Sequence, residues 1–260
     1  MDCAGGLGLL RKAREVARKI LRGNAGAERP REPVSLKEIN IHYVDIMKSR
    51  MPHDEAMKHA IGGDFEEIGL AELALLRGYG LAADGYLIDV GCGSGRLAQP
   101  LAQYLRGRYL GIDLVPDLVA HARKVAARDD WRFETIEEIG IPEGDGVADM
   151  VCFFSVLTHL RHEQSFWYLE EAKRVLRPGG VIVFSFLEYR EAGHIESLWS
   201  ALQDMKNGAT TPPNVFIDRD GIHLWAGALG LEVVDIRAGA DPIVPEGAMG
   251  QSVCVLRKAA

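Results

Sequence analysis

The sequence predicts an α/β fold with a mostly parallel sheet, and the spacing of its apolar runs carries this prediction. From residue 86 onward, short strand-like runs alternate with helical stretches near 95–105, 116–128 and 162–176. The strand-like runs are YLIDV (86–90), RYLGID (108–113), WRFE (131–134), DMVCFFS (149–155) and VIVFSFL (181–187). Continuous apolar strands separated by helices are typical of a parallel sheet that is covered on both faces.

Two further strand-like runs close the chain and follow a different pattern. LEVVDIR (231–237) and QSVCVLRK (251–258) have no helical stretch between them. A connection without a helix indicates antiparallel strands, because parallel neighbours need a long crossover. We therefore expect a seven-stranded sheet with an antiparallel hairpin at its C-terminal end.

Bulk composition excludes several function classes. A net charge of -7 over 260 residues argues against nucleic-acid binding, which favours a basic domain. The apolar runs fall short of the ~20 residues that span a bilayer, and we find no secretory signal. The four cysteines form no CxxC pair, and no cluster of His and Asp indicates a metal. These features predict a cytoplasmic protein without a metal site.

By pattern, the chain divides into three parts. They are a basic amphipathic helix with a linker (1–35), an N-terminal helical cap (36–80) and the α/β domain (81–260). Residues 9–22 carry six basic side chains and one acid around an apolar stripe. Such a helix binds anionic membranes, packs on the domain or a second subunit, or serves as a transit peptide. In the first case the protein would lie at the inner face of the membrane and its acceptor would be lipid-linked.

A glycine-rich loop follows the first predicted strand and reads DVGCGSGR (89–96). Glycines at the carboxyl end of a parallel strand let the backbone approach a ligand closely. The dinucleotide pattern G-x-G-x-x-G, counted from Gly91, requires a third packing glycine where Arg96 stands. A phosphate-binding loop would need Gly-Lys-Ser/Thr, which is absent. The loop therefore favours a ligand other than a dinucleotide or a nucleoside triphosphate.

An acidic residue ends the next predicted strand. Asp113 closes RYLGID, and its carboxylate can accept two hydrogen bonds from a ribose diol at the neighbouring strand end. Each hydrogen bond to a charged acceptor contributes ~1.5–3 kcal/mol. The alternative is a helix N-cap or a surface acid.

Together these residues resemble the class I S-adenosylmethionine-dependent methyltransferases, over roughly residues 62–258. LIDVGCGSGRLA is similar to the glycine-rich motif of that family, FFSVLTHL to its segment after the fourth strand, and RVLRPGG to its turn before the fifth. The resemblance implies a Rossmann-like fold with S-adenosylmethionine as cofactor. The cofactor contacts that it implies are Asp89, Gly91, Gly93, Gly95, Asp113, Leu114, Glu137, Phe154 and Gly63.

Some of these contacts have alternatives in the sequence. Asp89 would support either the loop or the cofactor's amino group. Glu137 stands where many family members have Asp, so Ile136 and Glu138 are neighbouring candidates for the adenine contact. Gly63 would offer backbone amides to the methionine carboxylate, or Asp64 would simply cap a helix.

His159, in LTHLRHE, is the predicted general base, since histidine titrates near neutrality. The alternative is a histidine that packs at the start of a helix. Residues 188–217 exceed a simple crossover and would form the acceptor pocket or a plain covering helix. The substrate contacts predicted in this segment are Glu188, Tyr189, His194 and Trp199, with Phe216 beside them.

The sequence thus predicts methyl transfer to an oxygen of a small molecule. A sugar hydroxyl is the first expectation, from a general resemblance to glycan-modifying members, and a quinone or lipid-type precursor is the second. The Asn/Asp-Pro-Pro-Tyr/Phe motif of nitrogen-directed members is absent after residue 152. Two alternatives from other classes are a non-catalytic cofactor-binding module and an NAD-dependent oxidoreductase. Neither the acceptor nor the oligomeric state follows from the sequence.

Overall fold

The computed structural model describes residues 35–208, 212–244 and 247–260. The predicted basic helix over 9–22 and its linker lie outside the described residues, so their contact with a membrane stays a prediction. Within the described ranges, no helix is both long enough and apolar enough to cross a membrane.

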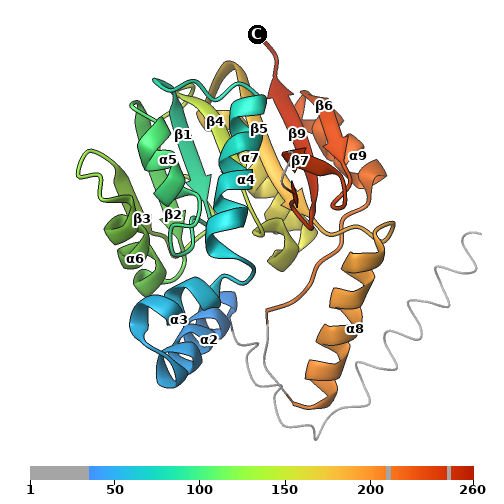
Figure 1. Ribbon diagram of the computed structural model, residues 1–260. Coiled ribbons are helices and arrows are strands. Elements are labelled where there is room, and N and C mark those ends of the chain that lie inside the picture. The colour runs from blue at the N-terminus through green and yellow to red at the C-terminus, as the bar shows by residue number, and fades with distance from the viewer. Residues whose placement is uncertain (1–34, 209–211, 245–246) are drawn as a thin grey trace, which may run out of the picture. The chain divides into compact units, whose positions relative to one another are not determined.

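A seven-stranded sheet forms the centre of the domain (Figure 1). Its strand order is β3-β2-β1-β4-β5-β9-β6. The strands are β1 (Tyr86–Val90), β2 (Arg108–Asp113), β3 (Arg132–Thr135), β4 (Ala148–Phe153), β5 (Leu176–Phe186), β6 (Leu231–Arg237) and β9 (Ser252–Lys258). The first five strands of the chain, β1 to β5, are parallel to one another in the sheet. β9 pairs antiparallel with both β5 and β6. The predicted mostly parallel sheet with an antiparallel C-terminal pair is confirmed.

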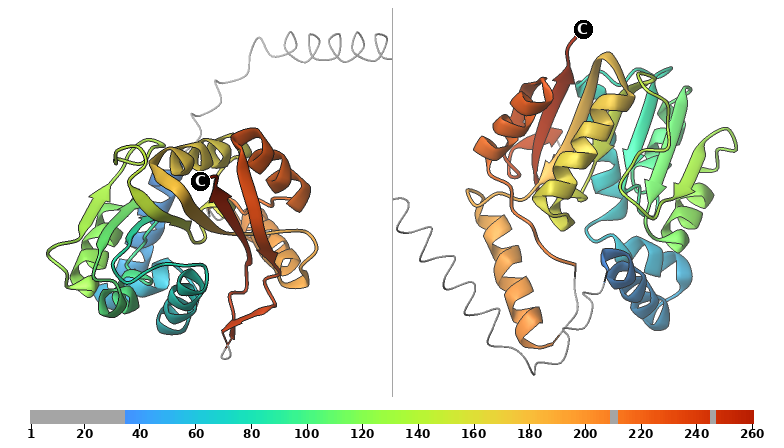
Figure 2. Two further views of the ribbon diagram at one scale, coloured as in Figure 1. Left: turned by 90° about the horizontal axis from the view of Figure 1, so that it is seen from above. Right: turned by 180° about the vertical axis from the view of Figure 1, so that it is seen from behind.

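Helices cover both faces of this sheet (Figure 2). α4 (Phe65–Gly78), α5 (Ala98–Tyr104) and α6 (Pro116–Ala126) pack on one face, and α7 (His162–Val175) and α9 (Arg219–Leu229) on the other. Successive strand residues point to opposite faces of the sheet. Leu87 therefore packs in the apolar cluster beneath α4, α5 and α6, and Ile88 in the cluster beneath α7 and α9. Both are fully buried, which explains why the parallel strands are continuously apolar.

Two details of the sheet differ from the predicted boundaries. β5 begins at Leu176, immediately after α7, because Leu176 already pairs with Ala148 before a register shift in the ladder. A short hairpin, β7 (Pro242–Val244) and β8 (Gly247–Ala248), precedes β9.

α8 (Ala192–Lys206) extends beyond the sheet on the same side as the helical cap (Figure 1), and only His194 of that helix is buried.

The cap consists of α2 (Leu36–Arg50) and α3 (His53–Ala60), which continue through a turn into α4. The Asp64 carboxylate caps α4 by accepting a hydrogen bond from the Glu67 N–H at 2.7 Å. Val44 and Met57 of the cap pack against Leu118, near the start of α6. The cap is thereby placed over the carboxyl end of β2, next to Asp113.

Candidate cofactor site

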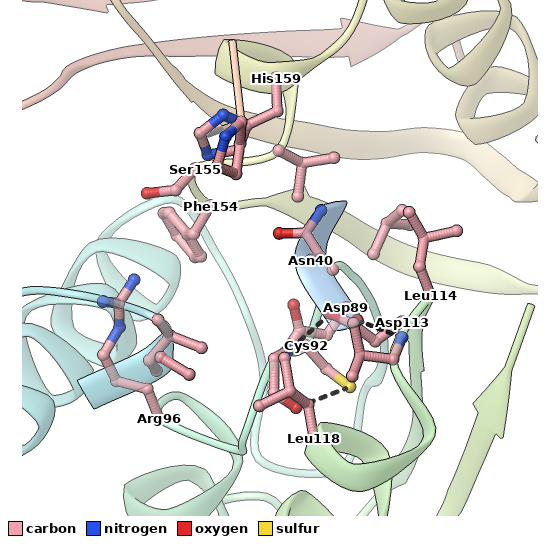
Figure 3. A pocket seen from close by; sticks show the side chains of 18 of the residues that line it. Asn40, Asp89, Cys92, Arg96, Asp113, Leu114, Leu118, Phe154, Ser155 and His159 are labelled. Atoms are coloured by element: carbon pink, nitrogen blue, oxygen red, sulfur yellow. Dashed lines mark hydrogen bonds between the residues drawn. The ribbon is translucent and has the colours of Figure 1, made fainter. Parts of the chain in front are cut away.

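A cavity of about 340 Å³ lies at the carboxyl ends of β1, β2 and β4, beneath the cap (Figure 3). In an open α/β sheet, ligands bind at this edge. Predicted site residues from separate elements meet on its wall. They are Asp89, Gly91, Gly93, Asp113, Leu114, Phe154 and His159.

The three glycines of the loop have different structural roles. Gly91 and Gly93 line the cavity and have positive φ values of 75° and 52°. Gly95 lies outside the lining, and a Cβ there would come within 2.7 Å of the Ala122 Cα. Gly95 therefore lets the loop pack against α6, and the cofactor contact that the resemblance implied for it stays a prediction that this lining does not support.

Asp113 is held by backbone amides at the cavity wall. One carboxylate oxygen accepts a hydrogen bond from the Gly93 N–H at 3.0 Å, and the other accepts from the Val115 N–H at 2.9 Å. A carboxylate offers about four lone-pair sites, so acceptor capacity remains on both oxygens. Burial raises the pKa of Asp113, while these amide donors favour its ionised form. The arrangement suits a pair of neutral hydroxyl donors such as a ribose diol.

Asp89 lies deeper in the same cavity and is 2% exposed. Its carboxylate accepts hydrogen bonds from the Tyr109 hydroxyl at 2.8 Å and from the Cys152 thiol at 3.5 Å. Burial raises the pKa of Asp89 to about 7, and the Tyr109 bond opposes this shift. Its donors come from neighbouring strands and not from the glycine loop. A buried carboxylate without a basic partner among the described residues favours a cationic ligand group.

On the adenine side, the structure distinguishes Ile136 from Glu137. Ile136 lines the cavity, and its N–H donates to the carbonyl oxygen of Asp113 at 2.9 Å. Glu137 points outward, with its side chain 80% exposed and paired with Lys37 at 2.8 Å. Of the neighbouring candidates for the adenine contact, this geometry therefore favours Ile136 over Glu137, and the contact itself stays a prediction. The bond from Ile136 extends the β2–β3 pairing by one residue, which turns the following side chain to solvent.

His159 lies on the cavity wall in a short 3-10 turn (Leu157–His159) after β4. Its Nδ1 lies 2.8 Å from the Pro213 carbonyl oxygen. A carbonyl only accepts hydrogen bonds, so Nδ1 carries the proton and Nε2 offers a lone pair. Burial lowers the pKa of His159, which keeps the ring neutral at physiological pH. Figure 3 shows the ring on the same side of the cavity as Phe154 and Ser155.

The predicted acceptor contacts are not brought to this cavity. Glu188 is 1% exposed, and both of its oxygens accept from the Arg219 guanidinium, at 2.6 and 2.7 Å. It also accepts from the Ser252 hydroxyl at 2.6 Å. Both carboxylate oxygens of Glu188 are thus engaged by internal partners, and Glu188 does not line the cavity, so this geometry gives no support to the substrate role predicted for it.

The other three predicted acceptor contacts have structural or surface positions. His194 is buried, accepts from the Glu188 N–H at 2.9 Å and donates to the Gly250 carbonyl at 3.0 Å. Tyr189 is exposed and stacks on Phe216 with ring centroids 4.5 Å apart. Trp199 is exposed on α8. None of them lines the cavity, because each lies after the chain has left the edge of β5.

Sequence reasoning missed a buried ion pair on the cavity wall. Arg96 donates from Nη2 to the Glu72 carboxylate at 2.7 Å and from Nη1 to the Gly62 carbonyl at 3.2 Å. It thus connects the glycine loop to α4 and to the turn below the cap. Gly62 lines the cavity, whereas Gly63 does not. The long charged side chain directly after the third glycine was the available signal, since a basic residue there needs a partner.

Comparison with known proteins agrees with this geometry. Residues 88–184 match the methyltransferase domain family. Residues 88–184 thus carry a methyltransferase domain, and the fold is shared with S-adenosylmethionine-dependent methyltransferases of known structure. This assignment covers the glycine loop, both strand-end acids and His159.

Relatives and solved structures resemble this domain over different lengths. A ubiquinone biosynthesis O-methyltransferase of Colwellia psychrerythraea is 30% identical over 158 residues, 58% of this chain and 63% of that protein. A malonyl-[acyl-carrier protein] O-methyltransferase of Serratia marcescens is 34% identical over 120 residues, 46% of this chain and 44% of that protein. Several other curated relatives are matched over about 40% of their length.

The fold is shared with magnesium protoporphyrin IX methyltransferase of Synechocystis, solved with bound S-adenosylhomocysteine (SAH). The TM-score is 0.53 at 16% identity, over 88% of this chain and 90% of that one. At this identity the likeness concerns the fold alone.

Proposed function

We propose that this protein transfers the methyl group of S-adenosylmethionine to a hydroxyl oxygen of a small molecule. The observation that carries the proposal is the Asp113 carboxylate, held by the Gly93 and Val115 amides on the wall of the 340 Å³ cavity. The relatives that are named O-methyltransferases support an oxygen acceptor. Methyl transfer in this chain is the proposal that the experiments below test.

The residues present fit S-adenosylmethionine. Asp113 provides acceptors for a ribose diol, and Leu114 and Ile136 provide apolar surface for the adenine. Asp89 provides a buried carboxylate for the ammonium group. A pyrophosphate would fit poorly, because Asp89 and Asp113 place two acids without a basic partner among the described residues on the same lining. This lining disfavours the alternative of an NAD-dependent oxidoreductase.

When bound, the cofactor supplies an activated methyl group on a sulfonium sulfur. The task left to the chain is to hold an acceptor hydroxyl in line with that group and to remove its proton. Positioning alone contributes ~7–11 kcal/mol to lowering a barrier. His159 has the geometry for the second task, since Nδ1–H is fixed on the Pro213 carbonyl and Nε2 is left to accept the proton. General base catalysis contributes typically ~10²–10⁴-fold in rate.

Of the two predicted acceptor types, the lining around His159 favours the quinone-type hydroxyl over the sugar. Val156, Leu160, Tyr43 and Pro212 share this cavity with His159. Predominantly apolar walls with few polar groups suit a flat apolar body. A sugar would leave several hydroxyls without partners, at a cost of ~1–3 kcal/mol each.

The test measures SAH binding and methyl transfer in the same preparations. His159→Ala should lower the rate of transfer from S-adenosylmethionine to catechol by about 10²-fold or more, with an unchanged SAH dissociation constant. His223→Ala is the matched control, because His223 is exposed on α9. Full activity of His159→Ala would refute the base, and a wild-type protein that binds neither SAH nor S-adenosylmethionine would refute the proposed function.

A further inference from the structure

A second cavity of about 230 Å³ adjoins the cofactor cavity. Its own lining comes from Gly63, Ile68, Ser185, Met249 and Gln251. It also shares wall residues with the first cavity, among them Phe154, Ser155 and Arg96. The two cavities therefore meet at the end of β4, on the wall that leads to His159. The sequence predicted Gly63 and Phe154 on this wall as cofactor contacts and placed the acceptor at residues 188–217 instead.

Ser155 stands at the junction in an unusual backbone conformation. Its φ is 57°, and it is one of two non-glycine residues with positive φ among those described. Such a conformation persists where the surroundings over-determine it. Here the Ser155 N–H donates to the Ser185 hydroxyl oxygen at 2.7 Å. The strained turn is thus fixed by a side chain that lines the second cavity.

The Ser185 hydroxyl, which accepts from Ser155, in turn donates a hydrogen bond to Gln251. Ser185 donates to the Gln251 Oε1 at 2.7 Å, so the amide of Gln251 is oriented with its oxygen toward β5. Its Nε2 group, which carries two donor hydrogens, has no acceptor within residues 35–208, 212–244 and 247–260. A half-buried donor on a cavity wall that lacks a protein partner is available to water or to an oxygen acceptor on a ligand.

The charge of the cavity is balanced within the protein. Arg96 is the basic residue of the lining, and its guanidinium is paired with the buried Glu72 carboxylate at 2.7 Å. Ile68 and Met249 add apolar surface. A charged acceptor would find no free countercharge here, and burying an unpaired charge is strongly unfavourable.

We propose that this second cavity is the acceptor subsite, and that it takes a compact, uncharged molecule with an apolar body. A carbonyl-type oxygen of that molecule accepts from the Gln251 Nε2, which points its hydroxyl toward the junction at Ser155. The inference rests on the proposed methyl transfer, and it replaces the acceptor contacts that the sequence predicted after β5. Gln251 is a residue that determines specificity in this scheme, and Ser185 positions it.

Binding of three probes to the SAH-loaded protein tests the site. Methyl 3,4-dihydroxybenzoate is the neutral probe, 3,4-dihydroxybenzoate is its charged counterpart, and methyl α-D-glucopyranoside is the sugar. By calorimetry, wild-type protein should bind the neutral ester about tenfold tighter than either of the others, a difference of ~1.4 kcal/mol.

Gln251→Glu is the decisive variant, because it keeps the acceptor for the Ser185 hydroxyl and replaces the free donor with an acceptor. It should weaken binding of the neutral ester about tenfold or more and leave the SAH dissociation constant within about twofold. Gln203→Glu, an exposed position on α8, makes the same chemical change away from the cavity and should alter neither value.

Each outcome decides the question. Equal binding of the ester by wild type and Gln251→Glu, or no preference of wild type for the ester, overturns the inference. A tenfold change of SAH affinity in Gln251→Glu overturns it too, because the cavity would then belong to the cofactor. All three results leave the proposed function intact, since that function fails only if the wild-type protein does not bind SAH or transfer a methyl group.

Discussion

The loop after β1 and the segment after β5 leave the same edge of the sheet, but their polar side chains have different surroundings. Asp89 and Asp113 line the cofactor cavity with acceptor capacity that the protein does not fill. Glu188, two residues after β5, accepts three hydrogen bonds from Arg219 and Ser252 and lies outside that cavity. Position at the carboxyl edge of a sheet is therefore insufficient to identify a ligand contact, and the partners of the side chain decide.

This difference separates two uses of a buried carboxylate. At the carboxyl ends of β1 and β2, Asp89 and Asp113 keep acceptor capacity for donors that arrive with a ligand. After β5, Glu188 connects the segment 188–217 to Arg219 of α9 and Ser252 of β9. The first kind should affect affinity when it is removed, and the second should affect stability.

Glu188→Ala should produce the largest effect. It leaves the Arg219 guanidinium, whose side chain is 25% exposed, without its bidentate partner. Breaking a buried pair costs ~3–5 kcal/mol, and partial exposure of Arg219 places the expected loss near ~3 kcal/mol. Thermal unfolding should show a decrease of ~6–12 °C. SAH affinity, measured below the unfolding transition, should be unchanged.

The matched control for Glu188→Ala is Glu196→Ala, an exposed acid on α8. It should change the free energy of unfolding by less than ~0.5 kcal/mol. Comparable melting temperatures for the two variants would contradict the structural role of Glu188. Loss of SAH affinity in Glu188→Ala alone would return this residue to the ligand site.

Asp113→Ala should have the opposite signature. Removing the carboxylate should weaken SAH binding by ~1.5–3 kcal/mol, because two hydrogen bonds from ribose hydroxyls lose a charged acceptor. Asp117→Ala, four residues later in the chain and paired with Lys48 at the surface, should change SAH affinity by less than ~1 kcal/mol. Calorimetric titration measures both, and equal affinity of Asp113→Ala and wild type would remove the assigned ribose contact.

The same contrast explains what could be predicted from sequence. The strands and the positions of Asp89, Gly91, Gly93 and Asp113 follow from local pattern, since each acid or glycine lies within a few residues of a buried strand end. His159 was found in the same way, one turn after β4. Local sequence determines where a strand ends, and the sheet then brings these ends together.

The acceptor side depends on residues that are distant in the chain. Ser185 and Gln251 are separated by 66 positions and meet only because β5 and β9 pair antiparallel. Arg219 reaches Glu188 from α9 for the same kind of reason. The local sequence does not show that the Glu188 carboxylate already has hydrogen-bond partners within the protein. Polar and aromatic residues after β5 are therefore predicted as ligand contacts, although they do not line the cavity.

A smaller effect should appear in the pH dependence of binding. Burial raises the pKa of Asp89 to about 7, so the unliganded protein holds a proton there below that pH. A cationic ammonium needs the ionised form, and binding must therefore release the proton. SAH affinity should rise about tenfold per pH unit up to pH ~7 and level off above it.

Asp89→Asn should bind SAH more weakly above pH ~7 and lose most of this pH dependence. The stability of the folded protein without ligand should depend on pH in the opposite direction to the SAH affinity. An unfolded chain loses the Asp89 proton near pH ~3.9, so the folded state without ligand becomes less stable as the pH rises from there toward pH ~7. A higher melting temperature of Asp89→Asn at pH ~8 checks this. SAH affinity of wild type that is flat between pH ~6 and ~8 would contradict an ammonium contact at Asp89.

The smallest expected effect distinguishes two adjacent residues after β3. Ile136 lines the cavity and Glu137 is 80% exposed. Ile136→Ala should weaken SAH binding about fivefold, because the adenine loses apolar contact worth ~1 kcal/mol. Glu137→Ala should leave affinity within about twofold, since an exposed pair with Lys37 contributes ~0–1 kcal/mol to stability and nothing to the cavity.

Side-by-side titrations of these two variants test how far a family pattern transfers to a single chain. The resemblance places an acid at position 137, whereas the strand register turns that side chain outward and turns Ile136 inward. If Glu137→Ala loses more affinity than Ile136→Ala, the loop after β3 must rearrange when the adenine binds. The register seen here would then describe only the unliganded protein.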